Sequence, residues 1–197
     1  MNKRQFLSSS LAGLGLLSTG GKITALEYYP LAANKKWAIV YGTWCGSTRD
    51  AALWISEGMG GIAQVFDVRE TPDPAPYENI VIGGAIRGGQ VSEELQKYIA
   101  ENKSKLKAKL RGLFVVCGNM MKPVTAEQKA EMIDRRLAKQ CDVKDLPSQA
   151  FLGRITYSLM DEASRETLQS FKMPEYDNLK RPECMAFGKD LLAAVNK

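Results

Sequence analysis

Five short apolar runs alternate with segments of helical periodicity, and this alternation limits the fold more than any other feature of the sequence. The apolar runs occupy residues 36–42, 62–68, 78–85, 112–118 and 148–155. The segments with helical periodicity occupy residues 47–60, 91–110, 125–140 and 182–195. Such a pattern is typical of a parallel sheet that helices cover on both faces. Because crossovers are right-handed, few arrangements remain, and we predict one doubly wound α/β domain with strand order 2-1-3-4-5.

Three of the predicted strands are followed by short segments rich in glycine and polar residues. These segments read YGTWCGST after the first strand, GGAIRGGQ after the third and CGNMMK after the fourth. In a doubly wound sheet, ligands bind beyond the carboxyl ends of the strands, where the winding direction reverses. The sequence therefore predicts one ligand site built from three loops.

Composition excludes several classes of function. The chain has no histidine, so the commonest general base and the commonest metal ligand are missing. Residues 1–25 hold three basic residues and no acid, which leaves 24 basic and 22 acidic residues in the rest of the 197-residue chain. That balance does not indicate nucleic-acid binding. The four cysteines at positions 45, 117, 141 and 184 form no C-x-x-C pair and do not predict a disulfide framework.

The first 25 residues have the build of a secretory signal, with a basic start and a short run rich in Ser, Gly and Leu. The string KRQFL resembles the twin-arginine export signal, with Lys3 in place of the first arginine. We expect an export signal over residues 1–25, a linker over 26–35 and one domain over 36–197. The apolar run is too short and polar to span a membrane, so we expect a periplasmic protein without an integral span in the mature chain. A disordered or membrane-anchoring N-terminus is the alternative.

The loop after the first strand offers many hydrogen-bond donors and no lysine. Hydroxyl groups come from Thr43, Ser47 and Thr48, Gly46 allows close approach of the backbone, and the next helix begins with unpaired N–H groups. The sequence matches neither the P-loop pattern nor G-x-G-x-x-G, and Cys45 to Arg49 is too short for a phosphatase loop. We interpret the loop as a site for a phosphate monoester that is held rather than transferred, with an ordinary capped turn as the alternative.

Two further segments extend this interpretation into a family resemblance. YGTWCGST resembles the flavodoxin phosphate loop [ST]-x-T-G-x-T, with Cys45 in place of the usual threonine. NIVIGGAIRGGQ resembles the VIG-[AG]-[SA]-I-R-x-G-x run of the flavodoxin-like protoporphyrinogen oxidases, and VVCGNMMKP lies where that branch has its second flavin loop. The resemblance extends from about residue 36 to the C-terminal helix.

The resemblance implies that FMN is the cofactor. Its phosphate would be held by Thr43, Trp44, Cys45, Gly46, Ser47 and Thr48. Its isoalloxazine ring would lie between one loop with Ala85, Ile86, Arg87, Gly88 and Gly89 and another with Cys117, Gly118, Asn119 and Met120. Neither ring loop contains the aromatic residue that flavodoxins usually stack on the ring, and this departure matches the oxidase branch more than the carrier branch.

Three roles fit Arg87. As a cation beside the flavin it would favour negative charge on the ring, and as a planar donor it would hold a substrate carboxylate such as a porphyrin propionate. As a third alternative, it is a surface arginine at the tip of a loop.

These expectations combine into an exported FMN-binding protein that acts in electron transfer as a carrier or a small flavin oxidoreductase. Its partner would be a redox protein, or a quinone or porphyrin substrate. One alternative is a menaquinone-dependent protoporphyrinogen oxidase, although the segment 156–181 carries five acidic residues where that branch is basic and apolar. The other alternative is a flavodoxin fold that has lost FMN and serves as a binding module. The sequence leaves open whether the protein is an enzyme.

Overall fold

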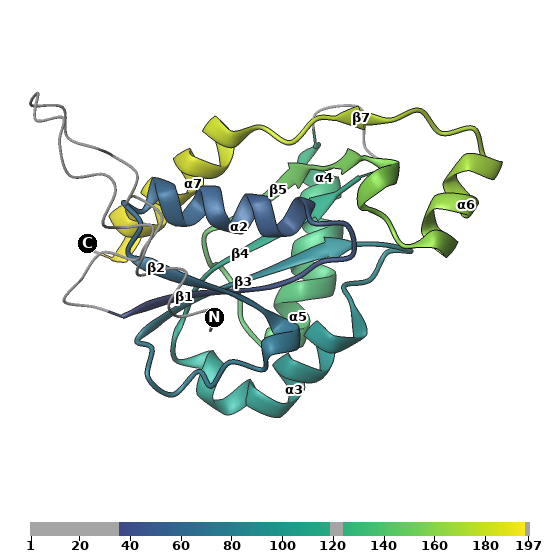
Figure 1. The fold of residues 1–197 in the computed structure, drawn as a ribbon. Helices are drawn as coiled ribbons and strands as arrows, with labels where there is room; N and C mark the ends of the chain where they lie inside the picture. Colours follow the sequence, from purple (N-terminus) through teal and green to yellow (C-terminus); the bar gives the residue numbers. More distant parts are fainter. Residues whose placement is uncertain (1–35, 119–123, 196–197) are drawn as a thin grey trace, which may run out of the picture.

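Five parallel strands form the central sheet of the computed structural model, which describes residues 36–118 and 124–195 (Figure 1). The strands are β1 (Trp37–Gly42), β2 (Ala63–Asp67), β3 (Asn79–Ile86), β4 (Leu110–Cys117) and β5 (Ser148–Leu152). Their order is β2-β1-β3-β4-β5, and every neighbouring pair is parallel. The predicted fold class and strand order are therefore confirmed.

Helices cover both faces of the sheet, as the amphipathic segments predict. One face is covered by α2 (Ser47–Gly58) and α7 (Arg181–Val195), and Figure 1 shows these two helices side by side above the sheet. The other face is covered by α3 (Glu93–Lys107) and by a continuous helical segment made of α4 (Ala126–Lys129), η2 (Ala130–Ala138) and α5 (Lys139–Cys141). The winding direction reverses between β1 and β3, which are neighbours in the sheet.

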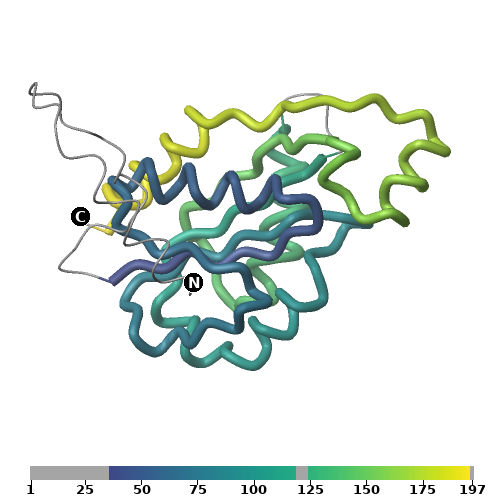
Figure 2. The backbone as a smooth tube through the Cα atoms, in the orientation of Figure 1, coloured from purple at the N-terminus to yellow at the C-terminus, as the bar shows by residue number. Residues whose placement is uncertain are grey.

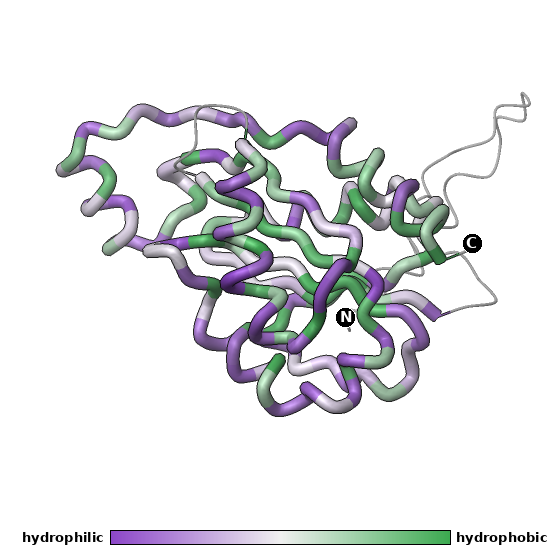
Figure 3. Tube along the Cα trace, turned by 180° about the vertical axis from the view of Figure 1, so that it is seen from behind, coloured by the Kyte–Doolittle hydropathy of each residue, from purple (hydrophilic) through white to green (hydrophobic). Residues whose placement is uncertain are grey.

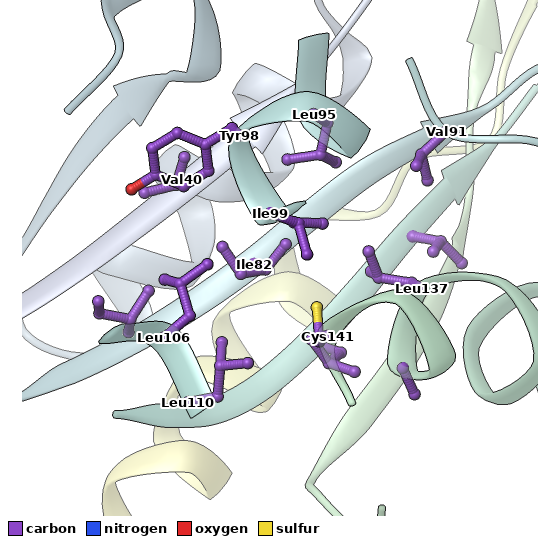
Figure 4. Close-up of a cluster of buried hydrophobic side chains, with 14 of the residues drawn as sticks. Val40, Ile82, Val91, Leu95, Tyr98, Ile99, Leu106, Leu110, Leu137 and Cys141 are labelled. Carbon is purple, nitrogen blue, oxygen red and sulfur yellow. The ribbon is translucent and has the colours of Figure 1, made fainter. Parts of the chain in front are cut away.

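Two hydrophobic cores result from the alternation of side chains along the strands. In β1, Ala38 and Val40 face the core under α3, whereas Trp37, Ile39 and Tyr41 face the core under α2 and α7. The first core appears in Figure 4, where side chains of β3, β4, α3 and the helical segment before β5 lie together. Figure 3 shows hydrophobic residues concentrated along the central strands. Both faces of the strands are thus buried, which explains their continuous apolar sequences.

Several predicted boundaries are wrong by a few residues. The helix predicted to reach residue 110 ends at Lys107, and Leu110 already belongs to β4. The strand predicted over 148–155 ends at Leu152, because the next residues leave the sheet as a separate short strand. The helix predicted over 125–140 is present, but Ala130–Ala138 is π-helical, and nothing in the sequence pattern explains this.

An arm leaves the sheet after β5 and returns to α7, and Figures 1 and 2 show it extending beyond the carboxyl ends of the strands. It comprises β6 (Arg154–Ile155), η3 (Tyr157–Leu159), α6 (Glu162–Ser170) and β7 (Tyr176–Asp177). At its base, β6 and β7 pair in antiparallel fashion. Leu159 lies before α6 and is exposed.

The predicted export signal and linker, together with Asn119 and Met120, lie outside the described residues. Within 36–118 and 124–195, no helix is long and apolar enough to cross a bilayer.

Two glycines allow α2 and α7 to touch backbone to backbone. A Cβ atom at Gly58 would lie 2.1 Å from the carbonyl oxygen of Met185, and one at Gly188 would lie 2.2 Å from the carbonyl oxygen of Ile55. Neither contact can be relieved by turning a side chain, so a larger residue at either position must push the two helices apart.

We predict that Gly188→Ala lowers the free energy of unfolding by about 1–3 kcal/mol, the usual cost of overpacking. This loss of stability should appear even though alanine has a higher helix propensity than glycine, by about 1 kcal/mol. Urea unfolding measures the change, and Lys189→Ala on the exposed side of α7 is the matched control, expected to stay within about 0.5 kcal/mol of the parent. A Gly188→Ala protein as stable as the parent would contradict the tight contact.

Candidate functional site

A cavity of about 250 Å³ lies at the carboxyl ends of the strands, where the predicted loops meet the arm. We refer to it as the rim cavity. The predicted site residues that line it are Thr43, Trp44, Cys45, Ser47, Thr48, Ala85, Ile86, Arg87, Gly88 and Gly118. Three other predicted residues, Gly46, Gly89 and Cys117, lie beside these in the chain but do not line the cavity. The topology thus brings the predicted loops together, as parallel strands in this order require.

The first loop keeps the start of α2 open. Gly46 precedes the helix with φ 82°, a left-handed conformation that glycine adopts at low cost, and a Cβ atom at this position would meet no other atom within 4 Å. Its N–H donates to the Thr43 hydroxyl at 3.1 Å, which stiffens the loop. No side chain in the described part of the chain caps α2. The first N–H groups of the helix therefore remain available for an anion, together with the positive end of the helix dipole.

The buried hydroxyl of Thr48 indicates that the first loop binds a polar group. The residue is fully buried and lines the rim cavity, yet its hydroxyl has no hydrogen-bond partner among the described residues. An unmet buried hydroxyl costs about 1–3 kcal/mol. A phosphate oxygen is a suitable acceptor for it, so the residues present fit a phosphate group.

The loop after β3 is a tight two-residue turn. The N–H of Arg87 donates to the Gln90 carbonyl at 2.9 Å, and the N–H of Gln90 donates to the Arg87 carbonyl at 3.1 Å. Gly88 and Gly89 have φ values of 58° and 75°, a conformation that explains the paired glycines. The turn places Arg87 at the edge of the cavity.

Arg87 connects this turn to two other segments. Its guanidinium carbon lies 5.9 Å from the centre of the Trp44 ring, a cation–π distance. Its Nη1 atom lies 4.0 Å from the carboxylate of Asp161, which belongs to the arm. Because both partners of the ion pair are about half exposed, the pair is a weak link. Arg87 is therefore a loop-tip arginine, but one that already contacts an aromatic ring and an acid.

The arm supplies a wall of the rim cavity, and sequence reasoning named none of the residues of this wall. Met160, Ser164, Thr167 and Leu168 line that wall. Asp161 caps α6 by accepting from the N–H of Ser164 at 2.8 Å and from its hydroxyl at 2.5 Å. The D-x-x-S spacing at the start of α6 is a capping signal that could have located this helix end.

Arg154 is a further cavity residue that sequence reasoning missed. It lies inside the segment predicted as the fifth strand, but Gly153 ends that strand and Arg154 begins β6. Its side chain is only 13% exposed, hydrogen bonds to Asp50 of α2, and lies 3.8 Å from the carboxylate of Asp177. Only the fold could reveal this contact, because Asp50 and Arg154 are 104 positions apart.

Burial disfavours the thiolate form of three of the four cysteines. Burial raises the pKa of the Cys45 thiol and the charge of Asp161 raises it further, whereas Arg87 lowers it. Burial also raises the pKa of Cys141 and of Cys184 to about 12. No disulfide joins the four cysteines within the described residues. Cys141 and Cys184, whose roles the sequence left open, pack in the two cores.

A family model for the flavodoxin domain matches residues 38–180. No curated protein matches the chain. Oxidised flavodoxin 1 from Bacillus cereus is 14% identical with a TM-score of 0.52, over 80% of this chain and 97% of that one. A flavodiiron core from Synechocystis is 15% identical with a TM-score of 0.51, over 87% of this chain but only 37% of that one. At such identities the two structures show a shared fold.

The capping contacts predict how Asp161 titrates. Its hydrogen bonds from Ser164 lower the pKa of this carboxyl below its usual value, and the charge of Arg87 lowers it further. The contribution of Asp161 to folding is thus fully present above about pH 3.9, the ordinary pKa, and is lost as pH falls through the lower folded value. We expect NMR titration to show a larger upward shift of this pKa in Ser164→Ala than in Arg87→Gln. The reverse order would mean that the ion pair, not the cap, holds Asp161.

Proposed function

We propose that this chain, which belongs to the flavodoxin domain family, binds FMN in the rim cavity and acts in electron transfer. The observation that carries the proposal is the buried, unpartnered hydroxyl of Thr48 beside the uncapped start of α2. Hydroxyl and backbone donors without a lysine suit a phosphate that is bound and not transferred.

The phosphate end of the proposed site is the first loop. The residues that we propose to hold the phosphate are Thr43, Trp44, Cys45, Gly46, Ser47 and Thr48. The loop is shaped before any ligand binds, because the Thr43 hydroxyl accepts from the N–H of Gly46 and the left-handed conformation of Gly46 orients the next peptide groups. Such preorganisation reduces the entropy that binding must overcome.

The ring end of the proposed site lies between the loops after β3 and β4. The residues that we propose to contact the ring are Ala85, Ile86, Arg87, Gly88, Gly89, Cys117, Gly118, Asn119 and Met120. Apolar side chains of the arm, Met160 and Leu168, close the cavity from the other side and would exclude water. Bound FMN would supply reversible electron transfer, while the protein sets orientation and electrostatics.

The electron-transfer role has two forms, a carrier or a small flavin oxidoreductase, whose partner would be a redox protein. A protoporphyrinogen oxidase that uses a quinone is a rival proposal, because GGAIRGG resembles that branch. The arm between β6 and α7 carries Asp161, Glu162, Glu166, Glu175 and Asp177, which speaks against docking on an anionic membrane surface. We also propose export to the periplasm on the basis of the signal-like residues 1–25.

A specific observation favours a third candidate, a flavin-free binding module. Within the described residues the ring loops offer no aromatic side chain, and the Trp44 ring is already covered by Arg87. A visible absorption spectrum of the purified protein, with identification of flavin released by acid, separates the candidates. Released FMN supports the proposal. A colourless protein that takes up no added FMN would refute it and favour the binding module.

Thr48→Val tests the phosphate contact through two measurements, the stability of the flavin-free protein and its affinity for FMN. Without flavin, we expect the free energy of unfolding to stay equal or rise, because the variant removes a buried hydroxyl that lacks a partner. With FMN, we expect the dissociation constant to rise about tenfold, since one hydrogen bond to a charged group is worth about 1.5 kcal/mol or more. Riboflavin, which has no phosphate, should bind as before.

Ser56→Ala is the matched control on the same helix. The buried Ser56 hydroxyl donates to the Ala63 carbonyl at 2.7 Å and lies at the other end of α2. We expect this variant to lose about 1 kcal/mol of stability and to bind FMN normally. If Thr48→Val behaved like Ser56→Ala, the hydroxyl of Thr48 would have no role in binding.

A further inference from the structure

The N-terminal turn of α2 contains a charge that opposes the proposed phosphate site. Asp50 lies in the first turn of the helix and is mostly buried, with its side chain 19% exposed. A phosphate monoester carries about two negative charges at neutral pH, so an uncompensated carboxylate at this end of α2 would repel it. A mostly buried charge also interacts over longer distances than an exposed one. A cation near Asp50 would remove this repulsion and so favour phosphate binding.

Two arginines reach Asp50, and they differ in burial. Arg49 lies 3.3 Å from the carboxylate, but its side chain is 59% exposed, so solvent and salt weaken the pair. Arg154 hydrogen bonds to the same carboxylate and is only 13% exposed. The buried partner is therefore the effective counter-charge.

Arg154 also lines the rim cavity itself. Its Nη2 atom donates to Asp50, and its Nη1 atom lies 3.8 Å from Asp177, but its buried Nε has no hydrogen-bond partner among the described residues. Thr48, also buried and unpartnered, lines the same cavity. Two unmet donors on one cavity point to an anionic ligand.

The local backbone fixes the direction in which Arg154 leaves the sheet. The N–H of Gly153 donates to the Cys117 carbonyl at 2.7 Å. A Cβ atom at Gly153 would lie 3.0 Å from the Cα atom of Gly118, so a side chain at this position would press the two loops apart. The strand therefore ends at this close approach, and Arg154 follows directly at the cavity.

We propose that Arg154 is a positioning and specificity residue for the phosphate of the ligand. It neutralises Asp50 and offers its unpartnered Nε–H as a donor from a fixed guanidinium. The cavity thereby selects flavin with a phosphate over flavin without one. The inference rests on the proposed function, because it names a further residue of the same site.

Arg154→Met tests the inference by its effect on two ligands. We expect the dissociation constant for FMN to rise about tenfold or more, the usual scale for a lost charge-assisted contact. For riboflavin we expect a change of less than about twofold. Arg154→Lys, which keeps the charge and loses the planar fork, should lie between the parent and Arg154→Met. Equal weakening of both flavins would indicate a structural role and overturn the inference.

A second substitution tests whether Arg154 acts through Asp50. Adding Asp50→Asn to Arg154→Met removes the carboxylate that the arginine neutralises, so the double variant should recover part of the FMN affinity. Asp50→Asn alone should bind FMN at least as tightly as the parent, and this variant keeps the test decisive if Arg154→Met does not fold. Loss of FMN affinity in Asp50→Asn would overturn the inference.

Arg181→Met is the matched control, because Arg181 also pairs with an acid of α2, Glu57, but lies away from the cavity. We expect it to leave the binding of both flavins unchanged. If the parent protein binds FMN and Arg154→Met binds it equally well, the inference fails while the proposed function stands. If the parent binds neither FMN nor riboflavin, the proposed function itself fails.

Discussion

The parallel pairing of β1 with both β2 and β3 is the constraint on which the rest of the structure depends. β1 lies in the middle of these three strands with all six of its residues buried. The chain therefore leaves β1 for one face of the sheet as α2 and leaves β3 for the other face as α3. The loops after β1 and β3 therefore turn to opposite faces of the sheet and leave a crevice between them. The cavity lies there because the topology leaves that edge open.

The site holds two of the five buried polar side-chain atoms that lack a hydrogen-bond partner among the described residues. The two cores are built from hydrophobic side chains, and the buried Ser56 hydroxyl of α2 has its carbonyl acceptor. At the cavity, Thr48 and the Nε atom of Arg154 are buried without partners among the described residues, and Gly46 has a left-handed conformation. Two such donors on one cavity are the kind of local departure that is expected at a functional site.

The sequence predicts features that depend on local pattern and misses those that depend on tertiary contact. Continuous apolar runs and helical periodicity suffice for the five strands, their order and the convergence of three loops, because a doubly wound sheet leaves few alternatives. The end of β5 at Gly153 depends on a close approach to Gly118. The pair of Arg154 and Asp50 depends on two segments that only the folded sheet brings together. Residue spacing carries no trace of either contact.

The two attachments of the arm differ in strength, and burial is the reason. At its base, Arg154 is mostly buried between Asp50 and Asp177, and β6 pairs with β7. Removing one partner of a buried ion pair is costly, because the other charge remains without compensation. Further along the arm, Asp161 pairs with Arg87 of the loop after β3, and both side chains are about half exposed. Such a pair contributes at most about 1 kcal/mol to stability. Displacing α6 from the cavity would therefore break an exposed ion pair, while the buried pair at the base of the arm stays in place beside the start of α2.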